Sequence, residues 1–530
     1  MHDIAIIGSG AGGGAIAYKL AKAGLKVLLI EKGDFIHRES FSKDELAYYR
    51  RNIITPKPQD EYHIIEQLVD GEWQRSKSSQ FFNGSLVGGS SNLMSGMFHE
   101  MHPDDFRLKS TFGEIKGANI EDWAIGYEEL KPYYDEAREL VGINSDTKES
   151  SFVKLFDTLP LDMRTTPRAI LAHDREDRNA CYYSNFCGSY GCSSGAKGSA
   201  REAFIVPAVK KYNLKVMHHT HVKKLLSTKD KITQAVVVNT QTMEESTIQA
   251  KLFIVSAQAH ESVRLLLNSK NSYYLNGLGN SSGELGKNLI FSAGGHGIAT
   301  FEKKSLNQEY LPKENEYGYF LNRSIYEWHR MGEQKGGIVE LMFEHANPIA
   351  KAVRSKYDRE GNLLWGKALT DKLQDVFTNH IYLRYEIFLD WLPTDNGYIT
   401  VDEKHSDRYN MPVGSLRLDS HPHNQRLTKM IDKQMQKYLK ELGAKEIEGS
   451  MGSFPPPNLI AGGARFGDDP KNSVLNRYCQ SHDIDNLFIV DASFMPTGGS
   501  IPYTWSIYAN ALRVGDYIAT NWGSMEFSKQ

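Results

Sequence analysis

A glycine-rich turn close to the first residue constrains this chain more than any other feature. Residues 8–14 (GSGAGGG) directly follow residues 3–7, which are apolar enough for a short buried strand. Helix-forming residues then run over 15–23, and residues 26–30 predict a second buried strand that ends at Glu31. The pattern predicts a strand–helix–strand unit that binds a dinucleotide.

Three glycines and one acid define the chemistry of this unit. Gly8 permits a tight turn, Gly10 lets the backbone approach a pyrophosphate, and Gly13 lets the helix pack closely on the strand. The phosphates then rest on the helix N-terminus. Glu31 stands roughly 20 residues beyond the glycines, where a carboxylate accepts hydrogen bonds from a ribose hydroxyl and repels the phosphate of NADP. The motif alone does not separate FAD from NAD, and a glycine-rich loop of another α/β fold is the alternative.

Length and charge bound the other possibilities. A chain of 530 residues exceeds the size at which one core stops growing, so two lobes are expected. The net charge of −3, from 62 basic and 65 acidic residues, does not favour nucleic acid as a partner. The apolar runs are shorter than the ~20 residues that a membrane span needs. Apolar residues of the first strand begin at residue 4, and no signal-peptide pattern precedes them. We therefore expect a cytoplasmic protein without a membrane span.

Motifs along the whole chain resemble those of the glucose-methanol-choline (GMC) oxidoreductases. Residues 83–92 (NGSLVGGSSN) are similar to the second flavin-binding segment of that family, and residues 486–497 (NLFIVDASFMPT) to its last strand, with a helix expected over 505–519. Intermediate motifs agree at residues 122–123, 132–134, 256–257 and 286–289. The resemblance implies FAD as the cofactor. It also implies an α/β (α+β overall) fold like that of p-hydroxybenzoate hydroxylase, with a Rossmann-like FAD-binding domain and a second domain built on an antiparallel sheet.

In that family both ends of the chain build the FAD-binding domain, which is therefore discontinuous. The resemblance implies that this domain takes residues 1–110, then residues 181–295 with the cysteine loop, and finally residues 456–530. A helical and substrate-domain insertion is implied at 111–180, and the antiparallel substrate domain at 296–455. Within the substrate domain, residues 377–391 predict a strand and residues 393–397 a turn before another strand at 398–401. The resemblance places the substrate between this sheet and the flavin.

The resemblance also implies the cofactor contacts. The backbone of Val222 is expected to meet the adenine, residues 89–92 the diphosphate and isoalloxazine, and Asp491 with Ala492 the ribityl and pyrophosphate region. The full expected set is Gly8, Gly10, Gly13, Glu31, Gly88, Gly89, Ser90, Asn92, Val222, Asp491, Ala492, Pro502 and Tyr503. Because no histidine stands beside residues 89–97, the flavin is expected to be bound noncovalently.

The catalytic residues of the family are missing where the motifs place them. Family members remove the hydroxyl proton with a histidine while hydride passes to the flavin, and a second His or Asn steadies the oxygen. The matching segment, residues 458–467 (NLIAGGARFG), has no histidine, and Ile501 precedes the matching Pro502. Three explanations stay open: another group reaches the flavin, a weaker base or water serves, or the chemistry is altered or lost.

Tyr503, Asn510 and His296 are the candidate catalytic residues. Tyr503 is favoured because it follows Pro502, although a tyrosine there can also only close a pocket wall. Two further histidines, His421 and His423, are weaker candidates, because the polar stretch around Pro422 is equally typical of a solvated loop.

Cys181, Cys187 and Cys192 fall within twelve residues of one another. Three thiolates this close can ligate an iron–sulfur cluster, and the stretch resembles a loop in membrane-linked sugar dehydrogenases of the family, some of which hold a three-iron cluster. Other members keep the loop without a cluster, and buried cysteines behave as small hydrophobes. Structural thiols or a disulfide are therefore favoured over a cluster, and Cys479 is expected to be a packed thiol.

Residues 187–199 (CGSYGCSSGAKGS) also resemble flavoproteins of aminoglycoside pathways that oxidise a primary hydroxyl of an aminosugar such as paromamine. A cationic substrate would favour pocket carboxylates, for which Glu340, Glu386 and Asp390 are candidates. We therefore expect FAD-dependent oxidation of a sugar or aminosugar hydroxyl in antibiotic biosynthesis, with oxygen or an external carrier as electron acceptor. A catalytically silent FAD-binding subunit and a non-oxidative flavoenzyme, such as a lyase or isomerase, are the alternatives.

Overall fold

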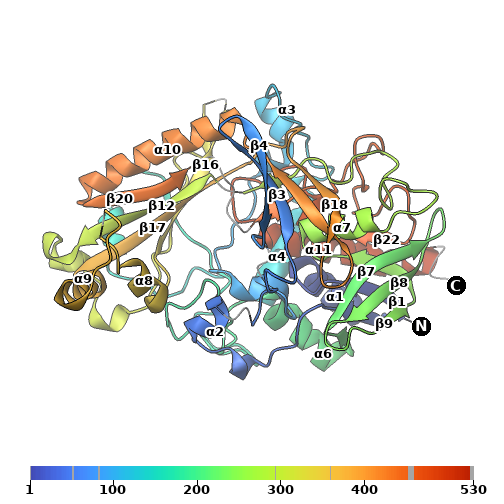
Figure 1. The fold of residues 1–530 in the computed structure, drawn as a ribbon, viewed down its shortest axis with the longest axis horizontal. Coiled ribbons are helices and arrows are strands. Elements are labelled where there is room, and N and C mark those ends of the chain that lie inside the picture. The colour runs from blue at the N-terminus through green and yellow to red at the C-terminus, as the bar shows by residue number, and fades with distance from the viewer. Residues whose placement is uncertain are drawn as a thin grey trace.

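The computed structural model of the chain describes residues 2–50, 53–81, 84–292, 294–332, 334–358, 360–451 and 459–525. Asn83, Asn458 and the expected boundary between residues 455 and 456 lie outside these ranges. Two lobes are evident (Figure 1): a parallel sheet with its helices on the right, and an antiparallel sheet covered by one long helix on the left. The predicted combination of a parallel α/β sheet with an antiparallel sheet is confirmed.

The parallel sheet draws its strands from both ends of the chain. Its order is β22-β10-β1-β2-β6, and every neighbouring pair is parallel. The strands are β1 (His2–Ile7), β2 (Val27–Ile30), β6 (Lys215–Met217), β10 (Ala250–Val255) and β22 (Leu487–Ile489). All four residues of β2 are buried, as expected of a parallel sheet that is covered on both faces.

The first helix begins earlier than its sequence pattern predicts. α1 spans Ala11–Lys22 rather than residues 15–23, because the glycines at positions 12 to 14 lie inside its first turn. These glycines let the helix approach the sheet: a Cβ at Gly12 would stand 2.2 Å from the carbonyl oxygen of Val490, and one at Gly13 would stand 2.0 Å from that of Gly8. α11 (Thr504–Asn521), predicted over 505–519, packs beside α1.

The antiparallel sheet forms the second lobe. Its order is β20-β12-β17-β16-β13-β5. The strands are β5 (Met163–Thr165), β12 (Gly295–Glu302), β13 (Arg323–Ile325), β16 (Gly337–Phe343), β17 (His380–Leu389) and β20 (Glu446–Met451). The strand predicted over 377–391 is thus shorter, because Phe377 belongs to the preceding helix α9 (Gly366–Thr378).

The two faces of this sheet pack differently. Val339, Leu341 and Ile387 point to the face covered by α10 (Pro422–Glu441), where they share a hydrophobic core with that helix. Ile338 and Phe388 alternate with them and join the core of the parallel-sheet lobe instead. Because successive side chains of a strand point to opposite faces, the face that carries Ile338 and Phe388 is turned toward the parallel-sheet lobe. We call it the inner face.

A third sheet joins segments that are distant in sequence. It consists of β18 (Tyr398–Ser406), β19 (Pro412–Leu418), β3 (His63–Val69) and β4 (Glu72–Ser78) in that order. β19 pairs in parallel with β3, with Ser415 opposite Ile64. The strand predicted at 398–401 after the 393–397 turn is confirmed, but it extends to Ser406 and lies outside the antiparallel sheet of the second lobe.

The remaining elements connect these sheets. The helices are α2 (Glu45–Arg50), α3 (Leu108–Phe112), α4 (Tyr127–Val141), α5 (Val153–Phe156), a π-helical turn (Arg201–Ile205), α6 (Val206–Tyr212), α7 (Ala259–Asn268) and α8 (Pro348–Arg354). The strands are β7 (Thr220–Ser227), β8 (Ile232–Asn239), β9 (Glu245–Ile248), β11 (Ile290–Phe291), β14 (Arg330–Met331), β15 (Gln334–Lys335) and β21 (Ile460–Ala461).

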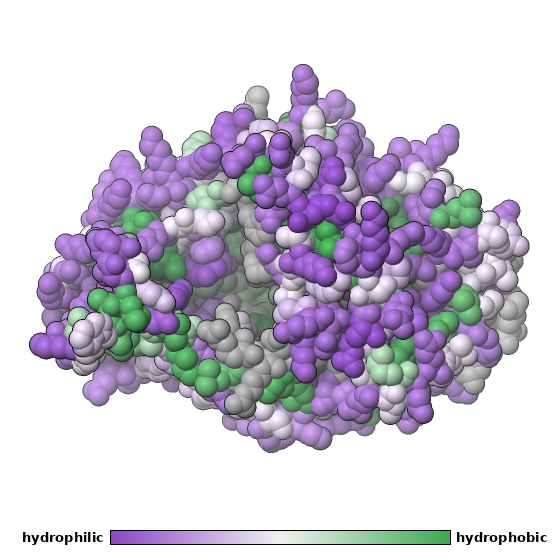
Figure 2. Space-filling view, viewed as in Figure 1, coloured by the Kyte–Doolittle hydropathy of each residue, from purple (hydrophilic) through white to green (hydrophobic). Residues whose placement is uncertain are grey.

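The surface is hollowed between the two lobes (Figure 2). The hollow lies beside the inner face of the antiparallel sheet, where the family resemblance places the substrate. None of the helices in the described ranges is long and apolar enough to cross a membrane.

Candidate active site

Two glycine segments meet at the end of β1. Gly88 and Gly89 have φ angles of 95° and 54°, in the left-handed region that favours glycine. A Cβ on Gly89 would lie 3.0 Å from the Cα of Gly10, so the segments are in close contact. A Cβ on Gly10 would meet no protein atom within 4 Å. This open side lies at the N-terminus of α1, where backbone N–H groups and the helix dipole suit a diphosphate.

Glu31 is fixed next to this turn. Its Oε2 accepts hydrogen bonds from the backbone and hydroxyl of Ser9, at 3.2 and 2.5 Å, and its Oε1 accepts one from the backbone of Gly33 at 2.9 Å. The same Ser9 hydroxyl accepts a hydrogen bond from the backbone of Gly88 at 3.0 Å. The predicted ribose acceptor and the second glycine segment are therefore joined through one serine.

Val222, the predicted adenine contact, lies on β7 next to the end of β2. The backbone of Thr220 on that strand donates to the carbonyl oxygen of Glu31 at 2.9 Å. Val222 is two residues further along, with its side chain buried. The structure thus brings the expected ribose and adenine contacts to one edge of the parallel sheet.

The C-terminal segment closes the site from the other side. Asp491 follows β22 directly, and its carboxylate accepts hydrogen bonds from the backbone and hydroxyl of Ser493 and from the hydroxyl of Ser262. Burial raises the pKa of Asp491. The Ser256 hydroxyl, near Gly12, is buried and has no hydrogen-bond partner within the described chain. An unsatisfied donor beside a helix N-terminus fits an anionic cofactor.

Asn92 and Ser90 belong to a short helix over Gly89–Leu93. The Asn92 amide donates to the carbonyl oxygens of Val87 and Gly89, at 3.1 and 2.9 Å, so it stabilises the glycine segment itself. Ser90 is partly exposed in the same turn. The residues at the glycine turn therefore fit a bound FAD.

A row of polar side chains crosses the inner face of the antiparallel sheet. Strand pairing sets His296 opposite Glu386, and Glu386 opposite Glu340, so all three share a face. The complete row is Ser450, His296, Glu386, Glu340, Ser324 and Arg164. Phe388, two residues from Glu386 on β17, identifies the face as the inner one. His296, a candidate from the sequence, is thus on the inner face, which is turned toward the parallel-sheet lobe.

His296 is connected to the C-terminal segment through the chain that precedes it. The hydroxyl of Ser292 donates to the carbonyl oxygens of Gly499 and Ile501, at 3.2 and 2.5 Å. Partial burial and the nearby Arg384 lower the pKa of His296, while Glu386 raises it. The net direction is downward, so the imidazole is neutral at neutral pH and can accept a proton.

Tyr503 and Asn510 lie in other environments. Tyr503 is 1% exposed, and its hydroxyl donates to the carbonyl oxygen of Leu459. Burial raises the pKa of Tyr503 well above its usual value, so it remains a donor at neutral pH. The Asn510 side chain donates to Cys479 at 3.3 Å and accepts from Arg513, inside the core beside α11. Tyr503 caps the N-terminus of α11 and Asn510 lies within that helix, whereas His296 lies on β12. Of the three candidates, only His296 combines partial exposure with a titratable ring.

The prediction of a solvated loop around Pro422 is wrong. Pro422 begins α10, and Nδ1 of His421 accepts a hydrogen bond from the backbone of His423 as the cap of that helix. A side chain that caps a helix satisfies an N–H group that the helix leaves unpaired. The Pro at the first helical position was the available signal for this helix start.

Sequence reasoning did not single out two buried histidines near the second flavin-binding segment. Nε2 of His99 lies 2.7 Å from a carboxylate oxygen of Glu340, and its Nδ1 lies 2.8 Å from the hydroxyl of Tyr326. Nε2 of His345 lies 2.8 Å from the hydroxyl of Ser95, and burial lowers the pKa of His345 to about 3. His99 follows the segment 89–97 by two residues, which was the available signal.

The three acids proposed for a cationic substrate are not equivalent. Glu340 is fully buried and paired with His99, and Glu386 is bonded to Arg384 at 2.7 Å. Asp390 is 6% exposed, and neither of its oxygens accepts a hydrogen bond with good geometry from the described chain. Among these three, Asp390 therefore has the most capacity for a further hydrogen-bond donor.

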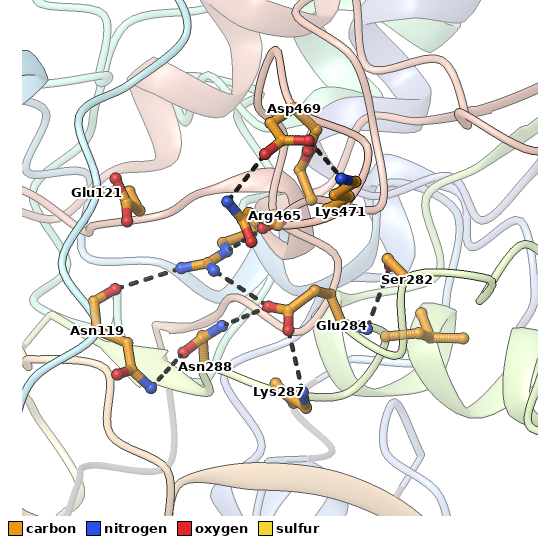
Figure 3. A network of polar contacts seen from close by, with 12 residues as sticks. Asn119, Glu121, Ser282, Glu284, Lys287, Asn288, Arg465, Asp469 and Lys471 are labelled. Atoms are coloured by element: carbon orange, nitrogen blue, oxygen red, sulfur yellow. Dashed lines mark hydrogen bonds and ion pairs between the residues drawn. The ribbon is translucent and has the colours of Figure 1, made fainter.

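A polar network anchors the segment that carries the histidine in other family members. Arg465 donates to the carbonyl oxygens of Asn472 and Asn119, at 2.9 and 3.3 Å, and forms an ion pair with Glu284 at 3.1 Å. Figure 3 shows the guanidinium reaching between Asn119 and Glu284, with Asn288 bridging the two. The network holds the segment that contains Leu459 against the chain at 284–288.

The three clustered cysteines are free thiols, as is Cys479. Cys181 and Cys192 pack against an apolar cluster of Ile170, Leu171 and Ala196. Burial raises the pKa of Cys181 to about 12, whereas Lys197 lowers that of Cys192. Within the described ranges, the groups with metal-ligand atoms gathered within 4.8 Å are Asp34 with His218 and His219, and His63 with His260 and Glu261. The cysteine trio is not among them.

Comparison with known proteins agrees with this architecture. Two family models described as GMC oxidoreductase match residues 11–291 and 393–511. The chain is 27% identical to 2-methyl-1,2-propanediol dehydrogenase of Mycolicibacterium austroafricanum, over 98% of this chain and 95% of the relative. It is 24% identical to paromamine 6'-oxidase of Streptomyces fradiae, over 98% and 91%. The structure of a fungal aryl-alcohol oxidase shares the fold, with a TM-score of 0.62 at 14% identity, over 98% of this chain and 99% of that one.

Proposed function

Given that this chain belongs to the GMC oxidoreductase family, whose members act on alcohol groups, we propose that it oxidises a hydroxyl group of a sugar or aminosugar. The substrate lies in the hollow between the FAD ring and the inner face of the antiparallel sheet. The polar row on that face, which includes His296, is the observation that supports this proposal best. Bound FAD supplies the hydride acceptor.

The aminosugar component of the proposal is supported by relatives rather than by the pocket. Paromamine 6'-oxidase and 6'''-hydroxyparomomycin C oxidase both align with nearly the whole chain, at 24% and 25% identity. An aminosugar substrate would place this chain in antibiotic biosynthesis. Glu340 and Glu386 on the inner face already face His99 and Arg384, so a substrate ammonium would have to share them. The neutral polyols therefore belong in any substrate screen beside the aminosugars.

The residues at the glycine turn hold the cofactor in this proposal. Gly10, Gly88 and Gly89 offer backbone N–H groups to the diphosphate, and Glu31 accepts from the ribose. Pro502 and Tyr503 follow the segment that Ser292 binds, so they form the wall beside the ring. Tyr503 stays protonated and donates, which suits positioning rather than proton removal.

We assign removal of the hydroxyl proton to His296. Its lowered pKa keeps the ring neutral at neutral pH, and Glu386 on the adjacent strand stabilises the imidazolium that forms. Ile501 and the histidine-free segment 458–467 stand where the family resemblance places the polar catalytic pair. In this assignment the group that accepts the proton lies on the antiparallel sheet rather than in the C-terminal segment.

Flavin reduction under anaerobic conditions tests the function and the base together. Substrates to add are paromamine, neutral sugars and 1,2-diols, with loss of the oxidised-flavin absorbance as the signal. His296→Ala should slow the reduction by about 10²–10⁴-fold, the usual contribution of a general base, without releasing the flavin. His380→Gln is the matched control, because His380 shares the strand and face of Glu386 but lies roughly 20 Å away, at about 3.4 Å per residue.

The outcomes separate the competing functions. An equal rate in the wild type and His296→Ala would remove His296 from the mechanism while leaving alcohol oxidation intact. A bound flavin that no alcohol reduces would instead support the silent-subunit or non-oxidative alternatives. Oxygen uptake during turnover would identify an oxidase, whereas reduction of an added dye without oxygen uptake would identify a dehydrogenase.

The packing of the cysteine loop supports structural thiols rather than a redox cluster. Cys181 contacts apolar side chains, and its raised pKa opposes the thiolate form that an iron ligand needs. Iron and acid-labile sulfide, measured on the same purified sample, should be absent. Stoichiometric iron with sulfide would overturn the assignment of these cysteines as structural.

A further inference from the structure

Two neighbouring histidines and one aspartate meet at an edge of the parallel sheet. Asp34 follows β2, and His218 and His219 stand between β6 and β7. Because β2 and β6 are parallel neighbours, the segments that follow them emerge at the same edge. Oδ1 of Asp34 lies 3.4 Å from Nδ1 of His218 and 3.0 Å from Nε2 of His219.

The backbone holds these side chains in place. The N–H of His219 donates to the carbonyl oxygen of Gly33 at 3.0 Å, and the N–H of Val87 donates to that of Asp34 at 2.9 Å. His219 has a φ of 52°, in the left-handed region that residues other than glycine seldom adopt. Adjacent side chains of an extended strand point to opposite faces. The turn at His219 instead directs two adjacent imidazoles to one carboxylate.

The spacing of the ligand atoms suits a transition-metal ion. Bonds of about 2.0–2.2 Å in a tetrahedral zinc site set neighbouring ligand atoms roughly 3.3 Å apart. The two separations from Asp34, 3.4 and 3.0 Å, lie on either side of that value. Imidazole nitrogen suits Zn²⁺, Ni²⁺ and Cu²⁺, whereas Mg²⁺ and Ca²⁺ prefer oxygen ligands.

The site can be reached from solvent. The exposed fraction of the side chain is 53% for Asp34, 42% for His218 and 24% for His219. The amide nitrogen of Gln241, which is itself exposed, lies 3.3 Å from Nε2 of His219 and has to give way to an ion.

The second group of possible metal ligands among the described residues is less suitable. His63 and His260 are buried, and Glu261 already forms an ion pair with Arg264 at 3.1 Å. An ion at that group would have to displace a buried guanidinium.

We propose that Asp34, His218 and His219 bind one divalent transition-metal ion, with water completing its coordination. The ion joins the segment after β2 to the segment before β7. Glu31 and Val222, the expected ribose and adenine contacts, each stand three residues from a ligand of the ion. The site therefore fastens the loops at the expected adenosine end of the cofactor site and takes no part in alcohol oxidation.

Titration calorimetry with ZnCl₂ tests the proposal on untagged, FAD-loaded protein that has been treated with a chelator and desalted. Zn²⁺ should bind saturably at one ion per chain, and MgCl₂ at the same concentrations should give no binding heat. This readout depends neither on turnover nor on the identity of the alcohol substrate, so it is separate from the test of alcohol oxidation.

Two variants and one control locate the ion. His219→Ala and Asp34→Ala should each weaken Zn²⁺ binding by about tenfold or more, because each removes one of three protein ligands. His173→Ala removes an exposed histidine outside the group and should bind Zn²⁺ as the wild type does. Absence of Zn²⁺ binding to the wild type would leave a histidine–aspartate ion pair only. Equal binding to the wild type and His219→Ala would place the ion elsewhere, such as at the three-cysteine loop. Either result overturns the proposal.

Discussion

Gly10 and Gly13 both stand in the glycine turn, but for different physical reasons. A Cβ on Gly13 would collide with the carbonyl oxygen of Gly8 at 2.0 Å, so this glycine is required by the fold. A Cβ on Gly10 would meet no protein atom within 4 Å, and its φ of −66° is open to any residue. The packing of the protein therefore does not require a glycine at position 10, and we propose that the diphosphate of FAD does.

This difference predicts opposite behaviour of two alanine variants. Gly13→Ala should lower the free energy of unfolding by about 3 kcal/mol or more, because backbone has to move. Gly10→Ala should change it by less than about 1 kcal/mol, yet weaken FAD binding at least tenfold because the methyl group occupies the diphosphate space. Denaturant unfolding of the flavin-free proteins and FAD titration measure the two effects. Normal FAD affinity in Gly10→Ala would place the diphosphate elsewhere.

The residues that could be identified from sequence are those whose role is local. The glycines and Glu31 lie within one strand–helix–strand unit, so their spacing alone predicts their neighbours. The pairs His99 with Glu340 and Lys335 with Asp105 join residues more than two hundred positions apart. Only the folded chain brings such pairs together, and for this reason the partners of these charged groups were not predicted, although Glu340 itself was named as a candidate.

At the scale of elements, the network around Arg465 connects segments that lie far apart in the sequence. Its guanidinium connects three separate segments, at Asn119, Glu284 and Asn472, and only about a tenth of its side chain is exposed. The same segment is also held by the pairing of β21 with β11 and by backbone hydrogen bonds from Gly462, Ala464 and Phe466 to residues 492–494. Arg465 adds side-chain contacts to this segment, which we propose forms a wall of the flavin site.

Replacing Arg465 should destabilise this wall specifically. Arg465→Met removes the better buried of the two cations that pair with Glu284 and should cost about 2–3 kcal/mol, somewhat less than breaking a fully buried ion pair. Lys471→Met, in the same stretch but with its side chain in solvent, is the control and should cost less than about 0.5 kcal/mol. Chemical denaturation measures both. Equal stability of the two variants would show that the remaining partners of Glu284, Lys287 and Asn288, are sufficient.

Element boundaries were predicted less well than the elements themselves. The helix over α1 was identified, but its start was placed four residues late because glycines are poor helix formers in isolation. Close packing on the sheet outweighs that propensity here. Similarly, aromatic and β-branched residues indicated the strand β17. Phe377 fits the same pattern, although it lies in the last turn of the helix α9. Tertiary contacts decide such boundaries, and a local pattern does not contain them.

On the scale of the whole molecule, the lobes are interwoven rather than joined by a linker. β3 and β4, from the first hundred residues, share a sheet with β18 and β19. Ile338 and Phe388 of the antiparallel sheet belong to the core of the other lobe. The core of the parallel-sheet lobe therefore includes residues of the antiparallel sheet, whereas the core beneath α10 is made of segments of the second lobe.

Thermal unfolding should accordingly occur in one step. Far-ultraviolet circular dichroism reports both lobes, while flavin fluorescence reports the cofactor site, and the two midpoints should coincide within about 2 °C if unfolding is all-or-none. A flavin signal that appears well before the loss of secondary structure would show that the lobes separate first.

The pairing of β22 with β10 also has a consequence for biosynthesis. More than 450 residues of the given sequence separate the glycine turn from β22, which pairs with β10, and from Asp491. At about 5–20 residues per second, a ribosome needs on the order of half a minute or more to cover that distance. The nascent chain exposes an incomplete dinucleotide cleft throughout that interval. Completion of the cleft therefore follows the synthesis of β22.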